Sequence, residues 1–225
     1  MVKCLRIIAR LTYGVRRLLG KIACLVFITC PALAAEDVTI LALGDSLTQG
    51  FGLVQEDGFV PQLDRWLDGQ GADVALINAG VSGDTTAGGA ARVEWSLTPD
   101  VDAMIVALGG NDLLRGLDPN EARKNLETIL QVAQTRNLPV LLVGMQAPSN
   151  YGPDYKKIFD AIYPDLATQY DTVYFESFFA GLGDGDIATL QPFFQADGIH
   201  PNAEGVSRIV DAMGPSVLAL IERAK

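Results

Sequence analysis

Five short apolar runs, separated by segments with helical periodicity, are the feature that most restricts how this chain folds. The runs are rich in Val, Ile and Leu, do not alternate strictly with polar residues, and are bounded by Gly, Asn or Pro. Strands that are buried on both faces of a parallel sheet have this pattern. The runs are 38–43, 74–77, 104–108, 140–143 and, more weakly, 172–175.

The segments between these runs predict helices. The clearest helix starts after Asp118, a suitable N-cap that is followed by Pro119 at the first helical position and by Glu121 three residues after the cap. Apolar residues then recur at helical spacing from Ala122 to Ala133. Strands that alternate with helices predict an α/β fold with right-handed crossovers, a three-layer α/β/α sandwich. Further helices are predicted over 59–67, 86–95, 155–169 and 203–221, where Gly214-Pro215 is expected to kink or break the last one.

The first 34 residues differ from the rest of the chain. They hold six basic and no acidic residues, and an apolar run over 22–30 leads into the small residues around Ala34. This order is typical of a secretory signal peptide cleaved after Ala34, and the run is shorter than the roughly 20 residues that span a bilayer. We therefore predict a signal peptide over 1–34, with an uncleaved anchor as the alternative. A single domain over 35–225 is expected to be exported, periplasmic or secreted, monomeric and without a membrane anchor.

Cysteine usage and charge exclude several functions for this domain. All three cysteines lie inside the predicted leader, so the domain has no disulfide, thiolate metal site or cysteine nucleophile. The net charge of the whole chain is −10, and 11 basic residues face 27 acidic ones after the leader, which argues against a nucleic-acid partner. With one histidine and no cysteine, we expect neither a metal nor a cofactor.

Polar residues and glycines follow the predicted strands, where parallel sheets form their sites. Ser46 follows the first run, and a serine hydroxyl becomes a nucleophile when a base takes its proton. His200, with Asp197 three residues upstream, fits a base and the carboxylate that orients it. Gly80 and Asn111 follow the second and third runs and offer a backbone N–H and a neutral amide to an oxyanion. Each residue alone has an ordinary turn or capping role, but together they predict a serine hydrolase.

Four sequence blocks resemble those of the SGNH (GDSL) hydrolase family, and the resemblance spans nearly all of 38–205. It looks closest to the periplasmic multifunctional acyl-CoA thioesterase I, arylesterase and lysophospholipase branch. The resemblance implies a flavodoxin-like sheet of about five parallel strands. It also implies that Ser46 is the nucleophile, His200 the general base and Asp197 its partner, with the N–H groups of Ser46 and Gly80 and the Asn111 side chain as oxyanion donors. The blocks are Gly44-Asp45-Ser46-Leu47, Asn78-Ala79-Gly80-Val81-Ser82-Gly83-Asp84, Gly109-Gly110-Asn111-Asp112 and Asp197-Gly198-Ile199-His200-Pro201.

The predicted substrate is a small-molecule acyl ester or a lysophospholipid. Leu113, Leu114, Tyr151 and Ile199 flank the blocks and are predicted to line an acyl groove, although packing of loops onto the core is the alternative. The resemblance implies medium or long acyl chains, and the acidic surface disfavours anionic acyl-CoA, so thioester cleavage is expected only in vitro. A carbohydrate acetylesterase and a non-catalytic solute-binding α/β domain are the alternative functions. The segment 178–194 receives no predicted role.

Overall fold

The computed structural model describes residues 38–183 and 187–225. Contacts between residues group Glu36–Lys225 into one unit. The predicted signal peptide and its cleavage point lie outside the described residues, so both stay predictions.

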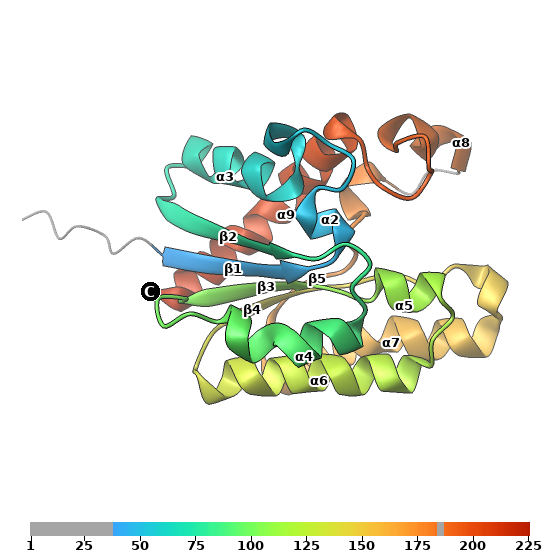
Figure 1. Ribbon diagram of the computed structural model, residues 1–225, viewed down its shortest axis with the longest axis horizontal. Helices are drawn as coiled ribbons and strands as arrows, with labels where there is room; N and C mark the ends of the chain where they lie inside the picture. The colour runs from blue at the N-terminus through green and yellow to red at the C-terminus, as the bar shows by residue number, and fades with distance from the viewer. Residues whose placement is uncertain (1–37, 184–186) are drawn as a thin grey trace, which may run out of the picture. The chain divides into compact units, whose positions relative to one another are not determined.

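A single sheet of five parallel strands forms the centre of this unit (Figure 1). The strand order β2-β1-β3-β4-β5 is the flavodoxin-like order, which confirms the expected sheet. In the register of β1, Gly44 is paired with Gly80 on one side and with Ala107 on the other. The carboxyl ends of three strands therefore meet at one edge of the sheet. The strands are β1 (Val38–Gly44), β2 (Val74–Gly80), β3 (Ala103–Ala107), β4 (Val140–Val143) and β5 (Val173–Phe175).

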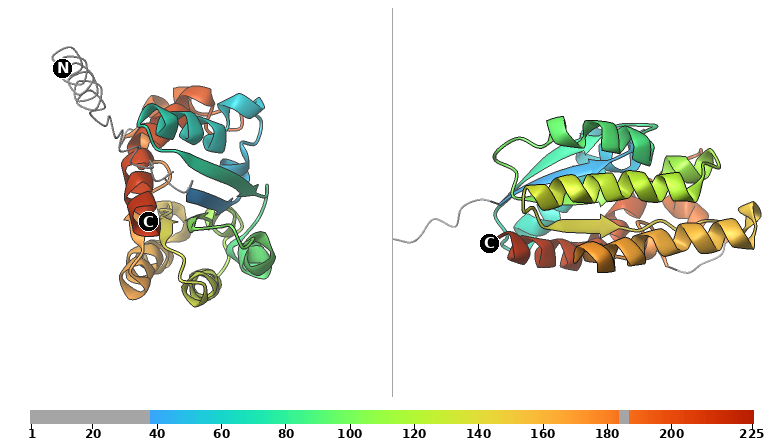
Figure 2. Two further views of the ribbon diagram at one scale, coloured as in Figure 1. Left: turned by 90° about the vertical axis from the view of Figure 1, so that its left-hand side faces the viewer. Right: turned by 90° about the horizontal axis from the view of Figure 1, so that it is seen from below.

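Helices cover both faces of the sheet, which gives the expected three layers (Figure 2). Strands β3 and β4 are buried at every residue and β1 at all but one, which explains why their sequences are apolar without alternation. One face carries α4 (Thr86–Ser96), α6 (Pro119–Thr135) and α7 (Pro153–Tyr170), and the other carries α3 (Phe59–Gly69) and α9 (Ala203–Ala224). The short α-helices are α2 (Ser46–Gln49), α5 (Gly110–Leu114) and α8 (Ile187–Leu190), and the 3-10 turns are Gln55–Asp57, Ser149–Tyr151, Ala180–Leu182 and Gln191–Phe193.

Local sequence signals predicted the start of α6 correctly but not the course of α9. The side chain of Asp118 accepts a hydrogen bond from the N–H of Asn120 and caps α6, as predicted. Gly214-Pro215 was expected to kink or break the last helix, and the break is wrong, because α9 continues through both residues. Pro215 is exposed, while buried apolar residues precede and follow it on the opposite side of the helix, so packing on the sheet keeps the helix intact. Among the described residues, no helix is long and apolar enough to cross a membrane.

Candidate active site

The turn after β1 presents Ser46 at the carboxyl edge of the sheet. Asp45 caps α2, since its Oδ1 accepts the N–H of Leu47 at 3.0 Å. Ser46 is the first residue of α2 and is only 8% exposed. The residue is therefore largely buried where the strand ends.

Ser46, His200 and Asp197 lie in one chain of hydrogen bonds. The Oγ atom of Ser46 is 2.9 Å from Nε2 of His200, and Nδ1 of His200 is 2.7 Å from Oδ2 of Asp197. A carboxylate can only accept, so the Nδ1 of a neutral imidazole donates to Asp197 and its Nε2 is left to accept the serine proton. The structure thus brings together the three residues predicted as catalytic. In the sequence, Asp197 lies 151 positions and His200 lies 154 positions after Ser46.

The loop that carries His200 holds the imidazole in place. Oδ1 of Asp197 accepts the N–H groups of Ile199 at 2.9 Å and His200 at 3.0 Å. These backbone donors, followed by the imidazole, lower the pKa of Asp197 to about 2, so the carboxylate is ionised at neutral pH. The ring of Phe51 packs on the imidazole with 4.6 Å between ring centroids. Gln195 donates its N–H to the carbonyl of His200 and closes the loop.

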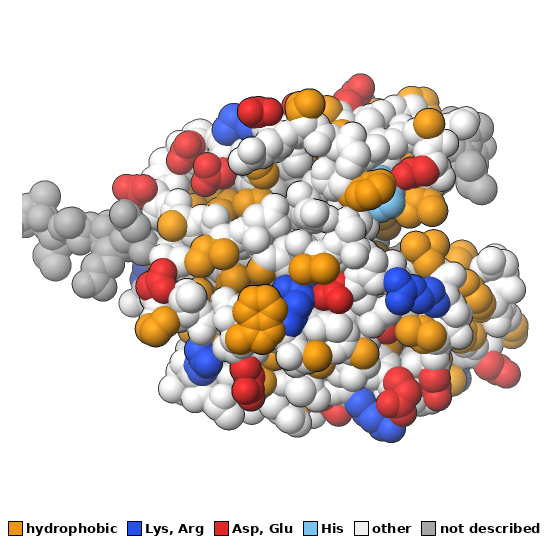
Figure 3. Space-filling view, viewed as in Figure 1, with side chains coloured by type: hydrophobic (Ala, Val, Ile, Leu, Met, Phe, Trp, Pro, Cys, Tyr) orange, Lys and Arg blue, Asp and Glu red, His pale blue; other side chains and the backbone are white. Residues whose placement is uncertain are grey.

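A cavity of about 550 Å³ opens beside Ser46 and His200. Figure 3 shows the single histidine at the edge of a hollow, with hydrophobic side chains on both sides of it. All four residues predicted to contact an acyl chain line this cavity, and the sequence did not indicate the other apolar residues of the wall. The predicted residues are Leu113, Leu114, Tyr151 and Ile199, and the others include Met145, Phe179 and Phe194.

Phe179 and Phe194 belong to the segment 178–194, to which the sequence assigned no role. Their rings lie 5.8 Å apart between centroids and form part of the cavity wall. The only local signal for them was the concentration of phenylalanine in this stretch, since the segment has no helical or strand periodicity.

Asn111 lies at the start of α5 and is oriented by Asp45. Its Nδ2 donates to Oδ2 of Asp45 at 3.3 Å, which leaves the second N–H of the amide free to point elsewhere. Asp45 is 1% exposed, and this burial raises its pKa to about 6. Gly109, before α5, has a φ of 116°, and Tyr163 donates its hydroxyl to the carbonyl of Leu108 at 2.8 Å behind this turn.

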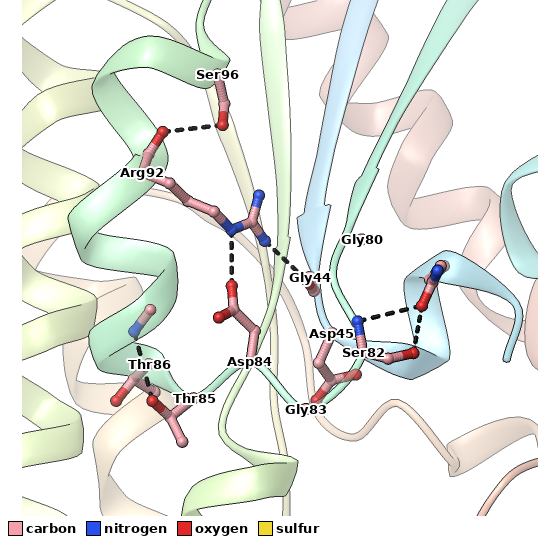
Figure 4. Close-up of polar contacts among 12 residues, drawn as sticks. Gly44, Asp45, Gly80, Ser82, Gly83, Asp84, Thr85, Thr86, Arg92 and Ser96 are labelled. Atoms are coloured by element: carbon pink, nitrogen blue, oxygen red, sulfur yellow. Dashed lines mark hydrogen bonds and ion pairs between the residues drawn. The ribbon is translucent and has the colours of Figure 1, made fainter.

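The N–H of Gly80, which was predicted to be an oxyanion donor, makes a different hydrogen bond in the structure. This N–H donates to Oδ1 of Asn78 at 2.9 Å, so it is not a free oxyanion donor in this conformation. A Cβ at this position would lie 2.3 Å from the backbone nitrogen of Gln49, so close packing of α2 on β2 explains the glycine. Gly83, three residues later, has a φ of 82°, and its N–H makes no hydrogen bond within the described parts of the chain. Figure 4 shows the loop from Gly80 to Asp84 passing the end of β1 at Gly44 and Asp45.

No grouping typical of a metal site is found in 38–183 and 187–225. Within these residues, no three His, Cys, Asp or Glu side chains are placed to share an ion. The one histidine is engaged by Asp197 and Ser46.

The fold and these contacts define an ester hydrolase with the SGNH fold. Residues 42–208 match the GDSL-like lipase/acylhydrolase family, and the chain belongs to this family. The esterase TesA of Pseudomonas aeruginosa is 38% identical over 199 residues, which cover 88% of this chain and 96% of that protein. The thioesterase 1/protease 1/lysophospholipase L1 of Escherichia coli is 35% identical, over 88% of this chain and 90% of its own length.

Solved structures of esterases agree with this family. The SGNH-hydrolase family esterase AlinE4 is 44% identical, with a TM-score of 0.68 over 82% of this chain and 96% of its own. A crystal structure of TesA is 37% identical, with a TM-score of 0.73 over 81% of this chain and 99% of its own. The chain is therefore an enzyme that hydrolyses small-molecule esters, and the alternative of a non-catalytic solute-binding domain is wrong.

Proposed function

We propose that this domain cleaves esters of medium and long acyl chains with Ser46 as the nucleophile, His200 as the general base and Asp197 as its orienting carboxylate. The observation that carries this proposal is the chain of hydrogen bonds from Ser46 through His200 to Asp197 at the edge of an apolar cavity. A serine becomes nucleophilic only when such a base is within hydrogen-bonding reach.

The reaction follows from these contacts in two acyl transfers. Nε2 of His200 takes the hydroxyl proton while Oγ of Ser46 attacks the ester carbonyl, and the carboxylate of Asp197 stabilises the imidazolium that forms. His200 then gives the proton to the leaving alcohol, and an acyl-serine remains. A water molecule attacks this acyl group in the same way, with His200 again as the base, and releases the carboxylic acid.

The oxyanion is stabilised by the N–H of Ser46, the amide of Asn111 and a third backbone donor from the loop after β2. We place this third donor at Gly83 instead of Gly80, because Gly80 already donates to Asn78. A structure of the adduct with a phosphonate tests this choice. The phosphoryl oxygen is expected to lie within hydrogen-bonding distance of the Gly83 nitrogen, and a bond to the Gly80 nitrogen would restore the first prediction.

The apolar cavity wall supports acyl chains over acetyl groups, which disfavours a carbohydrate acetylesterase. The names of the relatives include esterase, arylesterase and lysophospholipase as well as thioesterase. We propose esters and lysophospholipids as the physiological substrates, because the acidic surface repels anionic acyl-CoA at long range and an exported enzyme meets little of it. Export by the predicted signal peptide and a monomeric state belong to this proposal.

Labelling with a fluorophosphonate probe tests the nucleophile. Wild-type protein is expected to be labelled on Ser46, and Ser46→Ala to lose both labelling and ester hydrolysis. Ser207→Ala, on the exposed side of α9, is the matched control and should keep both. Full esterase activity in Ser46→Ala would refute the proposal.

The substrate class is tested with one matched series of substrates. It contains aryl esters of short and long acids, a lysophospholipid, an acyl thioester and an acetylated sugar. We expect kcat/KM to rise with acyl length and to include the lysophospholipid. Activity confined to acetyl groups would favour the carbohydrate acetylesterase instead.

A further inference from the structure

A nearly buried ion pair lies next to the proposed site, and the mechanism above does not use it. Nε of Arg92, on α4, is 2.6 Å from Oδ2 of Asp84, and the two side chains are only 10% and 17% exposed. A second nitrogen of the guanidinium, Nη2, donates to the carbonyl of Gly44 at 2.9 Å. Figure 4 shows both contacts made by one guanidinium between α4 and the end of β1.

The two partners of Arg92 belong to the two segments that must be aligned for catalysis. Gly44 is the last residue of β1 and lies two positions before Ser46. Asp84 directly follows Gly83 in the loop after β2. The carbonyl of Gly44 also accepts the N–H of Val81 at 3.1 Å, and the side chain of Gln49 in α2 accepts the N–H of Ser82 at 3.1 Å. Arg92 therefore adds a charged bridge to the direct contacts between the serine turn and this loop.

Gly88, in the first turn of α4, gives the carboxylate of Asp84 room to reach Arg92. A Cβ on Gly88 would lie 2.0 Å from Oδ1 of Asp84, so only glycine at this position lets the carboxylate approach the helix. Glycine weakens a helix by up to about 1 kcal/mol relative to alanine. The sequence therefore keeps an unfavourable helix residue at the point where Asp84 reaches Arg92.

Stability alone is a weak reason to keep a buried ion pair. Removing two charges from water offsets most of their attraction, and well-packed apolar residues are often equally stable in the same place. The guanidinium, by contrast, is planar and presents several donors in fixed directions, which suits it to hold two acceptors at a set geometry.

We propose that Arg92 is a positioning residue, which fixes the 80–84 loop against the serine turn through Asp84 and the carbonyl of Gly44. This inference rests on the proposed function, because the loop and the turn would supply backbone donors to the same oxyanion. Loss of the bridge would leave Ser46 and His200 in place and shift one donor relative to the other. A displacement of about 1 Å at such a site can reduce the rate by about 100-fold.

Two variants remove the bridge in different ways. Arg92→Gln removes the charge and the two-point contact, whereas Gly88→Ala leaves Arg92 and Asp84 unchanged and pushes the carboxylate away. For both we expect kcat to fall by about 10-fold to 100-fold with KM within about twofold of wild type. Affinity for a boronic acid that mimics the tetrahedral oxyanion should fall by the same factor as kcat/KM, while binding of the fatty acid product stays unchanged.

The matched controls are Gly69→Ala and Arg123→Gln. Gly69 lies in α3 with open space around its Cβ position, and Arg123 pairs with Asp165 on the surface between α6 and α7. Both controls should keep wild-type kcat. The melting temperature of Gly88→Ala is expected to fall, because displacing the carboxylate leaves the nearly buried guanidinium of Arg92 without its partner. kcat is therefore compared at a temperature at which circular dichroism shows every variant to be fully folded.

Wild-type kcat in Gly88→Ala and Arg92→Gln would overturn the proposal, as would a loss of activity that only follows the folded fraction measured by circular dichroism. If Arg92→Gln does not fold, Gly88→Ala decides the question alone. Activity in Ser46→Ala would instead refute the proposed function, so the two failures are distinguishable.

Discussion

Asp45 allows a sharp test of how burial acts in this site. Burial raises its pKa from 3.8 to about 6, although the N–H of Leu47 and the amide of Asn111 act in the opposite direction. The folded domain therefore holds a proton on this carboxyl at a pH where the unfolded chain has released it. Proton release by the unfolded chain favours unfolding, so this group makes the domain less stable as pH rises from about 4 to about 6.

The size of the effect follows from the shift in pKa. A difference of about two pKa units corresponds to about 3 kcal/mol, of which about 2 kcal/mol falls between pH 4 and pH 7. Asp45→Asn carries no charge at any of these pH values. We therefore expect the unfolding free energy of the wild type, minus that of Asp45→Asn, to fall by about 2 kcal/mol from pH 4 to pH 7.

Urea unfolding followed by circular dichroism at several pH values measures this difference. The comparison between wild type and variant cancels most of the pH dependence that other groups contribute. Any constant loss from the altered contact with Asn111 drops out when the difference at pH 7 is compared with the difference at pH 4. A difference that is flat over this range, or that grows with pH, would refute the reasoning that burial dominates at Asp45.

Three further substitutions test the remaining contacts. Asn111→Ala should lower kcat by about 100-fold to 1,000-fold, because it removes one oxyanion donor, and steady-state ester kinetics measure this loss. Its unfolding free energy should fall by only about 1 kcal/mol through the lost contact with Asp45, which thermal unfolding measures. Asp197→Asn should lower kcat by about 10,000-fold, because the amide no longer selects the required tautomer of His200, while fluorophosphonate labelling slows in parallel. Tyr163→Phe should lower the unfolding free energy by about 1–3 kcal/mol, because the buried carbonyl of Leu108 loses its donor, and an unchanged urea midpoint would contradict this.

Much of the fold followed from local patterns in the sequence. Buried strands and amphipathic helices bury fixed faces, so the period of the apolar residues indicates each element, as for 140–143 and for the helix that starts after Asp118. The same patterns located the strand ends, and Ser46 and Asn111 were found there because parallel strands place their carboxyl ends at one edge. His200 follows no strand directly and was found as the single histidine, with Asp197 three residues upstream.

Packing between distant residues decided the rest. The N–H of Gly80 donates to Asn78 and α9 continues through Pro215 because of neighbours that the local sequence does not specify. The burial of Asp45, the position of Phe179 in the cavity wall and the bridge from Arg92 to Gly44 likewise arise only in the folded chain.

The sequence by itself thus determined which segments form the sheet and which side chains come to its edge, since periodicity and strand direction are local properties. Only the tertiary structure decided which donor meets which acceptor and how far each carboxyl is removed from water. Hydrogen bonds and desolvation depend on distances of a few ångströms between segments far apart in the chain, and residue spacing does not contain those distances.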